Sequence, residues 1–146
     1  MKAVGVTENK RLEQESFKPS QLDMLAASLR LDVSDVESSM TALAKLLQSI
    51  SPTGVKISSR KKGLFTKDTV IEEISVRLGD QIYTISNARS KGSIACSRSK
   101  IVRDIVIKTD ELPMDKWAAS LAQQVALEAE QSAQSREVIN KLLGLS

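Results

Sequence analysis

The chain has 146 residues, of which 41% are apolar and 27% charged, with a formal net charge of +3, a composition typical of one globular domain. It has no histidine and a single cysteine, which excludes histidine-activated nucleophiles and metal centres built from histidines or several cysteines of one chain. No run approaches the roughly 18 apolar residues of a membrane-spanning helix, and the first residues lack the apolar core of a signal peptide, so we expect a cytoplasmic location.

The N-terminal third is predicted to be a tail followed by helices. Residues 1–18 are polar and mixed in charge, and we expect them to form a flexible tail. Residues 19–51 show helical spacing of apolar residues and predict two short helices joined as a hairpin. Ser20 is the expected N-cap of the first helix, and Asp32 or Ser34 that of the second.

A DNA-reading helix-turn-helix is an alternative interpretation of this helical pair. The second helix carries Asp35 and Glu37 near its start, where a recognition helix meets phosphates and base edges, and its only basic residue is Lys45. Simple packing of the two helices is therefore favoured.

The clearest local signal is a β-hairpin around Gly79-Asp80. A two-residue loop pairs Leu78 with Gln81, Val76 with Tyr83 and Ile74 with Ile85. Such a register places one apolar set on a face that must be covered, because side chains alternate along a strand. The covered set is Ile74, Val76, Tyr83 and Ile85, and the mostly hydrated set is Ser75, Arg77, Ile82 and Thr84.

Further strands are expected on both sides of this hairpin. Val55 and Ile57 suggest a short strand before it, and Lys91–Arg98 and Ile101–Ile107 continue the pattern after it. Ile101–Ile107 has apolar residues on both faces, apart from Arg103, and we expect it to be buried on both sides. The sheet is thus a meander of four or five strands over residues 54–108.

A basic segment, residues 55–68, contains the apolar pair of Gly63-Leu-Phe-Thr66 between lysines. One interpretation is a loop that inserts Leu64 and Phe65 into an anionic membrane surface or a partner's pocket. The alternative, which we favour from the sequence, is a loop that tucks both side chains under itself while the lysines stay solvated.

The last segment predicts a helix over residues 113–143, anchored by Trp117, Leu121 and Val125 at spacings of four. An unbroken helix of this length measures about 46 Å, against a domain diameter of roughly 38 Å, so its end would overhang. The overhang would offer a partner contact that we assign to Val138, Ile139, Leu142 and Leu143. An equal alternative is a break near Ser132–Ser135, after which the last turns pack on the N-terminal helices.

Basic residues cluster in two segments, 55–68 and 89–103, which lie on strands or loops of one sheet. If they converge, they form a patch that attracts a polyanion such as nucleic acid. The candidate residues are Lys56, Arg60, Lys61, Lys62, Arg89, Lys91, Arg98 and Lys100. Phe65 is the only aromatic residue in either segment, so the base stacking used by RNA-binding sheets is poorly supplied.

Candidates for chemistry are weak. Cys96 is expected to be a buried, inert strand residue. Glu72 and Glu73 are adjacent on a strand, so they point to opposite faces and cannot act as a carboxylate pair. We therefore expect no catalytic, cofactor-binding or metal site, and no enzyme.

The sequence as a whole predicts a single α+β domain over residues 19–146, with a helical hairpin and a long C-terminal helix on one face of an antiparallel meander. The expected function is a non-enzymatic interaction or assembly module. It would self-associate or dock on a protein partner through the C-terminal helix or a sheet edge. The alternative is a binder of nucleic acid or of an anionic membrane surface through the basic residues.

Overall fold

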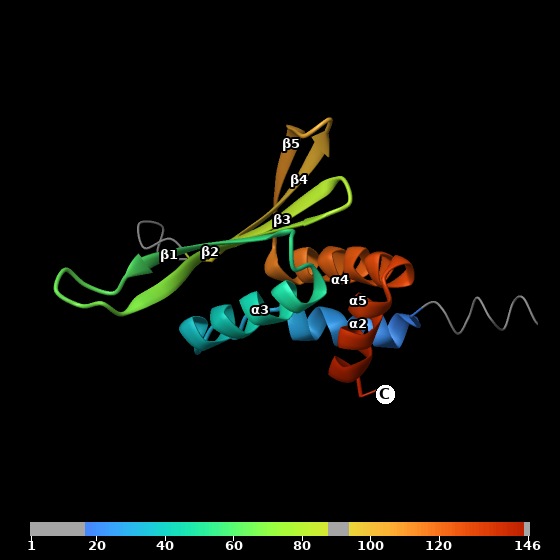
Figure 1. Ribbon diagram of the computed structural model, residues 1–146, viewed down its shortest axis with the longest axis horizontal. Helices are drawn as coiled ribbons and strands as arrows, with labels where there is room; N and C mark the ends of the chain where they lie inside the picture. Colours follow the sequence, from blue (N-terminus) through green and yellow to red (C-terminus); the bar gives the residue numbers. More distant parts are fainter. Residues whose placement is uncertain (1–16, 88–93, 145–146) are drawn as a thin grey trace, which may run out of the picture.

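The computed structural model is described for residues 17–87 and 94–144, and over these residues the helices lie on one face of a five-stranded antiparallel sheet (Figure 1). The neighbouring strands in the sheet follow the chain order, β1-β2-β3-β4-β5. This confirms the predicted α+β meander. The elements are α2 (Pro19–Leu29), α3 (Val36–Ile50), β1 (Val55–Lys61), β2 (Thr69–Leu78), β3 (Gln81–Ser86), β4 (Ala95–Val102), β5 (Ile105–Leu112), α4 (Met114–Gln131) and α5 (Ala133–Leu142).

The central hairpin has the predicted register. Val76 pairs with Tyr83 and Ile74 with Ile85, and all four side chains are buried. Gly79 has a φ of 63°, a left-handed conformation that the two-residue loop requires and glycine adopts without strain. The alternation of apolar side chains along the strands and the turn at Gly79 therefore determine which face of the sheet receives the helices.

The strands after this hairpin differ from the prediction. The expected strand Ile101–Ile107 is in fact divided by a turn at Arg103 and Asp104, whose φ angles are 51° and 64°. Two successive positive φ angles form the type of turn that joins antiparallel strands through two residues. The first of these strands, β4, is described from Ala95, and its predicted start at Lys91 lies outside the described residues. Because of the turn, the sheet continues to Leu112 rather than ending at residue 108.

The predicted helix caps were also wrong. Ser20 lies inside α2, and the N-cap of α3 is Asp35, whose carboxylate accepts a hydrogen bond from the backbone N–H of Ser38 at 3.3 Å. Asp32 instead accepts hydrogen bonds from the hydroxyl and backbone N–H of Ser34, which hold the pKa of Asp32 below its ordinary value. Asp32 thus stabilises the turn before α3 rather than the helix itself.

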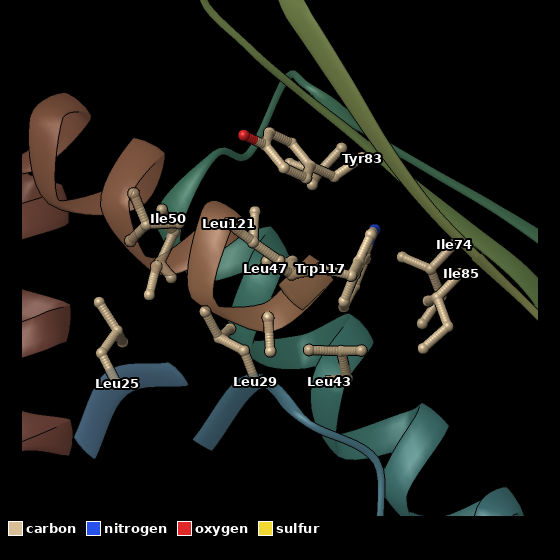
Figure 2. Packing of buried hydrophobic residues seen from close by; sticks show 14 of the residues in the cluster. Leu25, Leu29, Leu43, Leu47, Ile50, Ile74, Tyr83, Ile85, Trp117 and Leu121 are labelled. Carbon is tan, nitrogen blue, oxygen red and sulfur yellow. The ribbon is translucent and has the colours of Figure 1, made fainter. Parts of the chain in front are cut away.

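Trp117 occupies the contact between α4 and the sheet (Figure 2). The ring is fully buried, meets Tyr83 edge-on with centroids 6.4 Å apart, and its Nε1–H donates to the carbonyl of Ser97 at 3.0 Å. The hydroxyl of Tyr83 is 3.0 Å from the hydroxyl of Ser120 on α4. These contacts satisfy the polar atoms of both aromatic side chains, which otherwise make burial costly.

The C-terminal segment follows the second of the two alternatives, because the helix is interrupted at Ser132. The Ser132 hydroxyl accepts from the N–H of Ser135, capping α5. The hydroxyl of Ser135 donates to the backbone carbonyl of Ile50 at the end of α3, 2.9 Å away. Consequently α5 folds back against α3 and α4 instead of extending past the sheet (Figure 1).

At Gly54 the backbone of the α3–β1 connection passes close to the backbone of β2. A Cβ on Gly54 would lie 2.7 Å from the carbonyl oxygen of Arg77, which cannot move without disturbing the strand. We expect Gly54→Ala to lower the free energy of unfolding by about 1–3 kcal/mol, measured by urea denaturation. Gly63→Ala is the matched control, because a Cβ there meets its nearest neighbour, the Thr66 methyl group, at 3.7 Å. Equal stabilities of the two variants would contradict this close contact.

Candidate interaction surfaces

Metal ligands and the thiol of Cys96 are the groups considered for chemistry. No group of three or more metal-ligating side chains comes together among residues 17–87 and 94–144. Cys96 is buried beside Ile85 on the next strand, and its burial raises the pKa of the thiol to about 11. A thiol with so high a pKa is almost entirely protonated near neutral pH and is therefore a poor nucleophile.

A hollow of about 420 Å³ lies between α3 and β2. The carboxylate of Glu37 and the ammonium group of Lys62 form an ion pair of 3.1 Å at its wall. Both side chains are about half exposed, so solvent screens the pair, and it contributes little to stability. The pairing also leaves neither group as an isolated charge directed into the hollow.

The four residues predicted as a partner contact are divided by the fold of α5. Ile139 is completely buried and Leu143 nearly so, within the chain's own core. Val138 is partly buried against the same cluster, and Leu142 is 40% exposed. The fold-back of α5 thus gives this apolar stripe an intramolecular partner, and of the four only Leu142 has a largely accessible side chain.

The predicted basic residues that lie on strands do not form one patch. Paired residues of neighbouring strands point to the same face, and the register aligns Lys56 with Ser75, Thr84 and Ser97. Arg98 instead pairs with Tyr83, whose side chain points to the helices. Lys100 lies two residues further along on the same face as Arg98, while Arg89 and Lys91 fall outside the described residues.

Arg98 also has a structural contact. Its guanidinium donates to the hydroxyl of Ser120 on α4 at 2.9 Å, and the hydroxyl of Tyr83 reaches the same atom. Arg98 therefore helps to hold α4 on the sheet.

The loop between β1 and β2 projects away from the helical layer (Figure 1). Leu64 is 92% exposed and Phe65 is fully exposed, so the expectation that the loop tucks them under itself was wrong. The backbone N–H of Lys62 donates to the carbonyl of Asp68 at 2.9 Å, closing the neck of the loop. A five-residue apex cannot fold over its own two large side chains while its ends are held this close.

Strand β5 is the second exposed apolar feature. It is a terminal strand of the sheet, and Figure 1 shows the β4–β5 hairpin rising away from the helices. Ile105, Val106 and Ile107 are 66%, 51% and 57% exposed, so the expectation that this strand is buried on both sides was wrong. The sequence contained a signal for this hairpin: two apolar pairs, Ile101-Val102 and Ile105-Val106, flank a charged pair.

Comparison of the chain with models of protein families, with curated proteins and with solved structures found no match. Among the helices that the structure describes, none combines the length and the apolar character needed to cross a bilayer. The two exposed apolar surfaces described above, the β1–β2 loop and the β5 edge, are therefore the candidates for function.

Proposed function

We propose that the protein is an assembly module, in which two copies pair through their β5 strands into one continuous sheet. The observation that supports this most is the run of three exposed apolar residues on the terminal strand, Ile105 to Ile107. In the described part of the chain, β5 pairs with β4 alone. Its other edge offers backbone N–H and C=O groups to a further strand.

The opposite edge strand is much less suited to self-pairing. β1 carries Lys56, Arg60 and Lys61 among its seven residues and no acidic residue. Lysine and arginine on an edge oppose pairing with a second copy, because like charges face each other. β5 has three apolar residues at one end, and its charges, Lys108, Asp110 and Glu111, have both signs.

The charges of β5 favour one register. Antiparallel pairing of two identical strands about a two-fold axis sets one residue opposite itself. Centring the pair on Lys108 or on Asp110 places like charges in contact, which is unfavourable. Centring it on Thr109 places Lys108 of each copy opposite Asp110 of the other, with Val106 opposite Leu112 at both ends. Of the registers that avoid like charges and keep both helical layers on one side of the sheet, this one pairs the longest part of β5.

A charge swap tests this register. Lys108→Asp sets two acidic residues against each other at two symmetric positions, and Asp110→Lys sets two basic ones. We expect each single substitution to weaken dimerisation by about tenfold or more. The double variant, Lys108→Asp with Asp110→Lys, restores the opposite-charge pairs and is expected to recover wild-type affinity. Sedimentation velocity over a range of protein concentrations measures the dissociation constants.

Two controls accompany the swap. Within one chain Lys108 and Asp110 lie 3.8 Å apart, so the single variants are also checked for thermal stability. Lys45→Asp changes an exposed charge on α3, which packs against β1 and β2 towards the other edge of the sheet, and is expected to leave dimerisation unchanged. A wild-type chain that stays monomeric at every concentration would overturn the proposal, as would a dimer that is indifferent to both single substitutions.

A further inference from the structure

We propose that the β1–β2 loop is an anchor for an anionic membrane surface, in which Leu64 and Phe65 enter the headgroup region while lysines contact the lipid phosphates and carboxylates. This inference is independent of pairing through β5. It concerns the opposite corner of the sheet from the β4–β5 turn (Figure 1).

The loop holds its apolar pair ready for insertion. The backbone hydrogen bond from Lys62 to Asp68 closes the neck, and the hydroxyl of Thr66 accepts from the N–H of Asp68 at 3.0 Å. Leu64 and Phe65 lie at the apex, and nothing in the described part of the chain covers either side chain. An apex that is already formed loses little conformational freedom when it binds.

The apolar side chains at the apex have an unusually high exposure for the part of the chain that the structure describes. Most large apolar residues of the described chain lie in the core, and Phe65 and Leu64 are the most exposed of those outside it. Removing the apolar surface of Leu64 and Phe65 from water is favourable. A membrane interface accepts such side chains at a depth of about 5–10 Å while the backbone stays in the polar zone.

The charges around the apex match an anionic surface. Lys61 and Lys67 flank the pair and are exposed, and the loop itself contains one acidic residue, Asp68. Lys62 adds a further positive charge, which is paired with Glu37 of α3. Lysine stems allow the ammonium groups to reach lipid headgroups while Leu64 and Phe65 go deeper. Each basic residue near an anionic leaflet contributes about a fivefold increase in partitioning.

The shape of the loop favours a bilayer over nucleic acid. The loop is a projecting tip rather than a groove that could follow a phosphate backbone (Figure 1). Its single aromatic ring provides one stacking platform, whereas single-strand binding uses several in succession. A projecting loop with apolar side chains at its tip and basic residues behind them is suited to insertion among lipid headgroups.

Vesicle co-sedimentation tests the anchor, using phosphatidylcholine vesicles with and without phosphatidylserine. We expect the wild-type chain to bind the anionic vesicles and to bind the neutral ones at least tenfold more weakly. Leu64→Ser with Phe65→Ser keeps every charge and is expected to lower anionic binding about tenfold or more. Lys61→Gln with Lys67→Gln keeps the apolar pair and is expected to lower it by a factor of about 25.

The matched control is Val33→Ser, which removes a 72% exposed apolar side chain from the α2–α3 connection and is expected to leave binding unchanged. Insertion is read independently from Phe65→Trp, whose added fluorescence should shift to the blue with anionic vesicles, since Trp117 is already buried. Absence of binding to anionic vesicles would overturn the proposal. So would binding that survives Leu64→Ser with Phe65→Ser, or tight binding of single-stranded nucleic acid that depends on the same lysines but not on the apolar pair.

Lys108→Asp provides a separate check, because it disrupts the proposed β5 pairing without altering the loop. If this monomeric variant still requires Leu64 and Phe65 for vesicle binding, the anchor stands whatever the outcome for self-association. Loss of all vesicle binding in a folded Lys108→Asp variant would contradict an anchor that acts through the loop alone.

Discussion

Replacement of Trp117 by alanine is expected to lower the free energy of unfolding by about 3–5 kcal/mol, the range for deletion of a fully buried large aromatic side chain. The indole lies between α4 and the sheet with no exposed surface, so its removal leaves a cavity that the neighbouring strands cannot close. It also leaves the carbonyl of Ser97 without its side-chain donor. Natural domains are stable by only about 5–15 kcal/mol, so the variant should be close to unfolding at ambient temperature.

Two further variants separate the components of this loss. Trp117→Phe keeps a ring in the site but removes the Nε1–H donor, and we expect a smaller loss of about 1–2 kcal/mol. Lys116→Ala alters the exposed neighbouring position and is expected to have no effect beyond a few tenths of a kcal/mol. Trp117 is the only tryptophan, so unfolding is followed by far-ultraviolet circular dichroism. A Trp117→Ala variant as stable as the wild type would contradict the central position of this residue.

The part of the fold that the sequence predicted well is the part determined by local chemistry. Around Gly79, alternating residues and a turn with a required left-handed φ specify one register, and a slip of one residue would expose Ile74 and Tyr83. The buried stripe of α4 could also be predicted from local sequence, because Trp117 and Leu121 are separated by four residues, about one helical turn. In both cases the period of the apolar residues also indicates which face is buried.

The β4–β5 hairpin was missed because its turn has no glycine or asparagine. Arg103 and Asp104 are at the two positions where positive φ angles are needed, and arginine is an unusual residue there. A run of isoleucine and valine on both sides of this pair looks like one doubly buried strand. The exposure of β5 follows from its position at the edge of the sheet, and that position depends on the strand order.

The β1–β2 loop and α5 illustrate a limit of apolar periodicity as a guide to burial. Apolar pattern shows that a residue prefers to leave water, but not whether the same chain covers it. Leu64 and Phe65 were expected to be covered and are exposed, whereas Ile139 was expected to be available and is buried. In each case the outcome depends on tertiary geometry: a closed loop neck in the first, and the direction of α5 after Ser132 in the second.

The fold-back of α5 predicts that two substitutions on this helix, Ile139→Ala and Leu142→Ala, differ in their effect on stability. We expect Ile139→Ala to lower the free energy of unfolding by about 2–5 kcal/mol, because its side chain is fully buried between α5 and the rest of the core. Leu142→Ala, one turn later on the same helix, removes a side chain that is 40% exposed and should cost about 1 kcal/mol or less. Urea denaturation of both variants gives the comparison.

The size of the difference distinguishes the two paths of the C-terminal segment. A continuous helix that overhangs the domain would leave both side chains outside the core, so the two substitutions would have similarly small effects on monomer stability and would act on association instead. A helix that turns back at Ser132 makes Ile139 a core residue, so its loss is seen in unfolding at every protein concentration. Because the Ser135 hydroxyl bonds to the carbonyl of Ile50, Ser135→Ala should shift stability in the same direction as Ile139→Ala by about 1 kcal/mol.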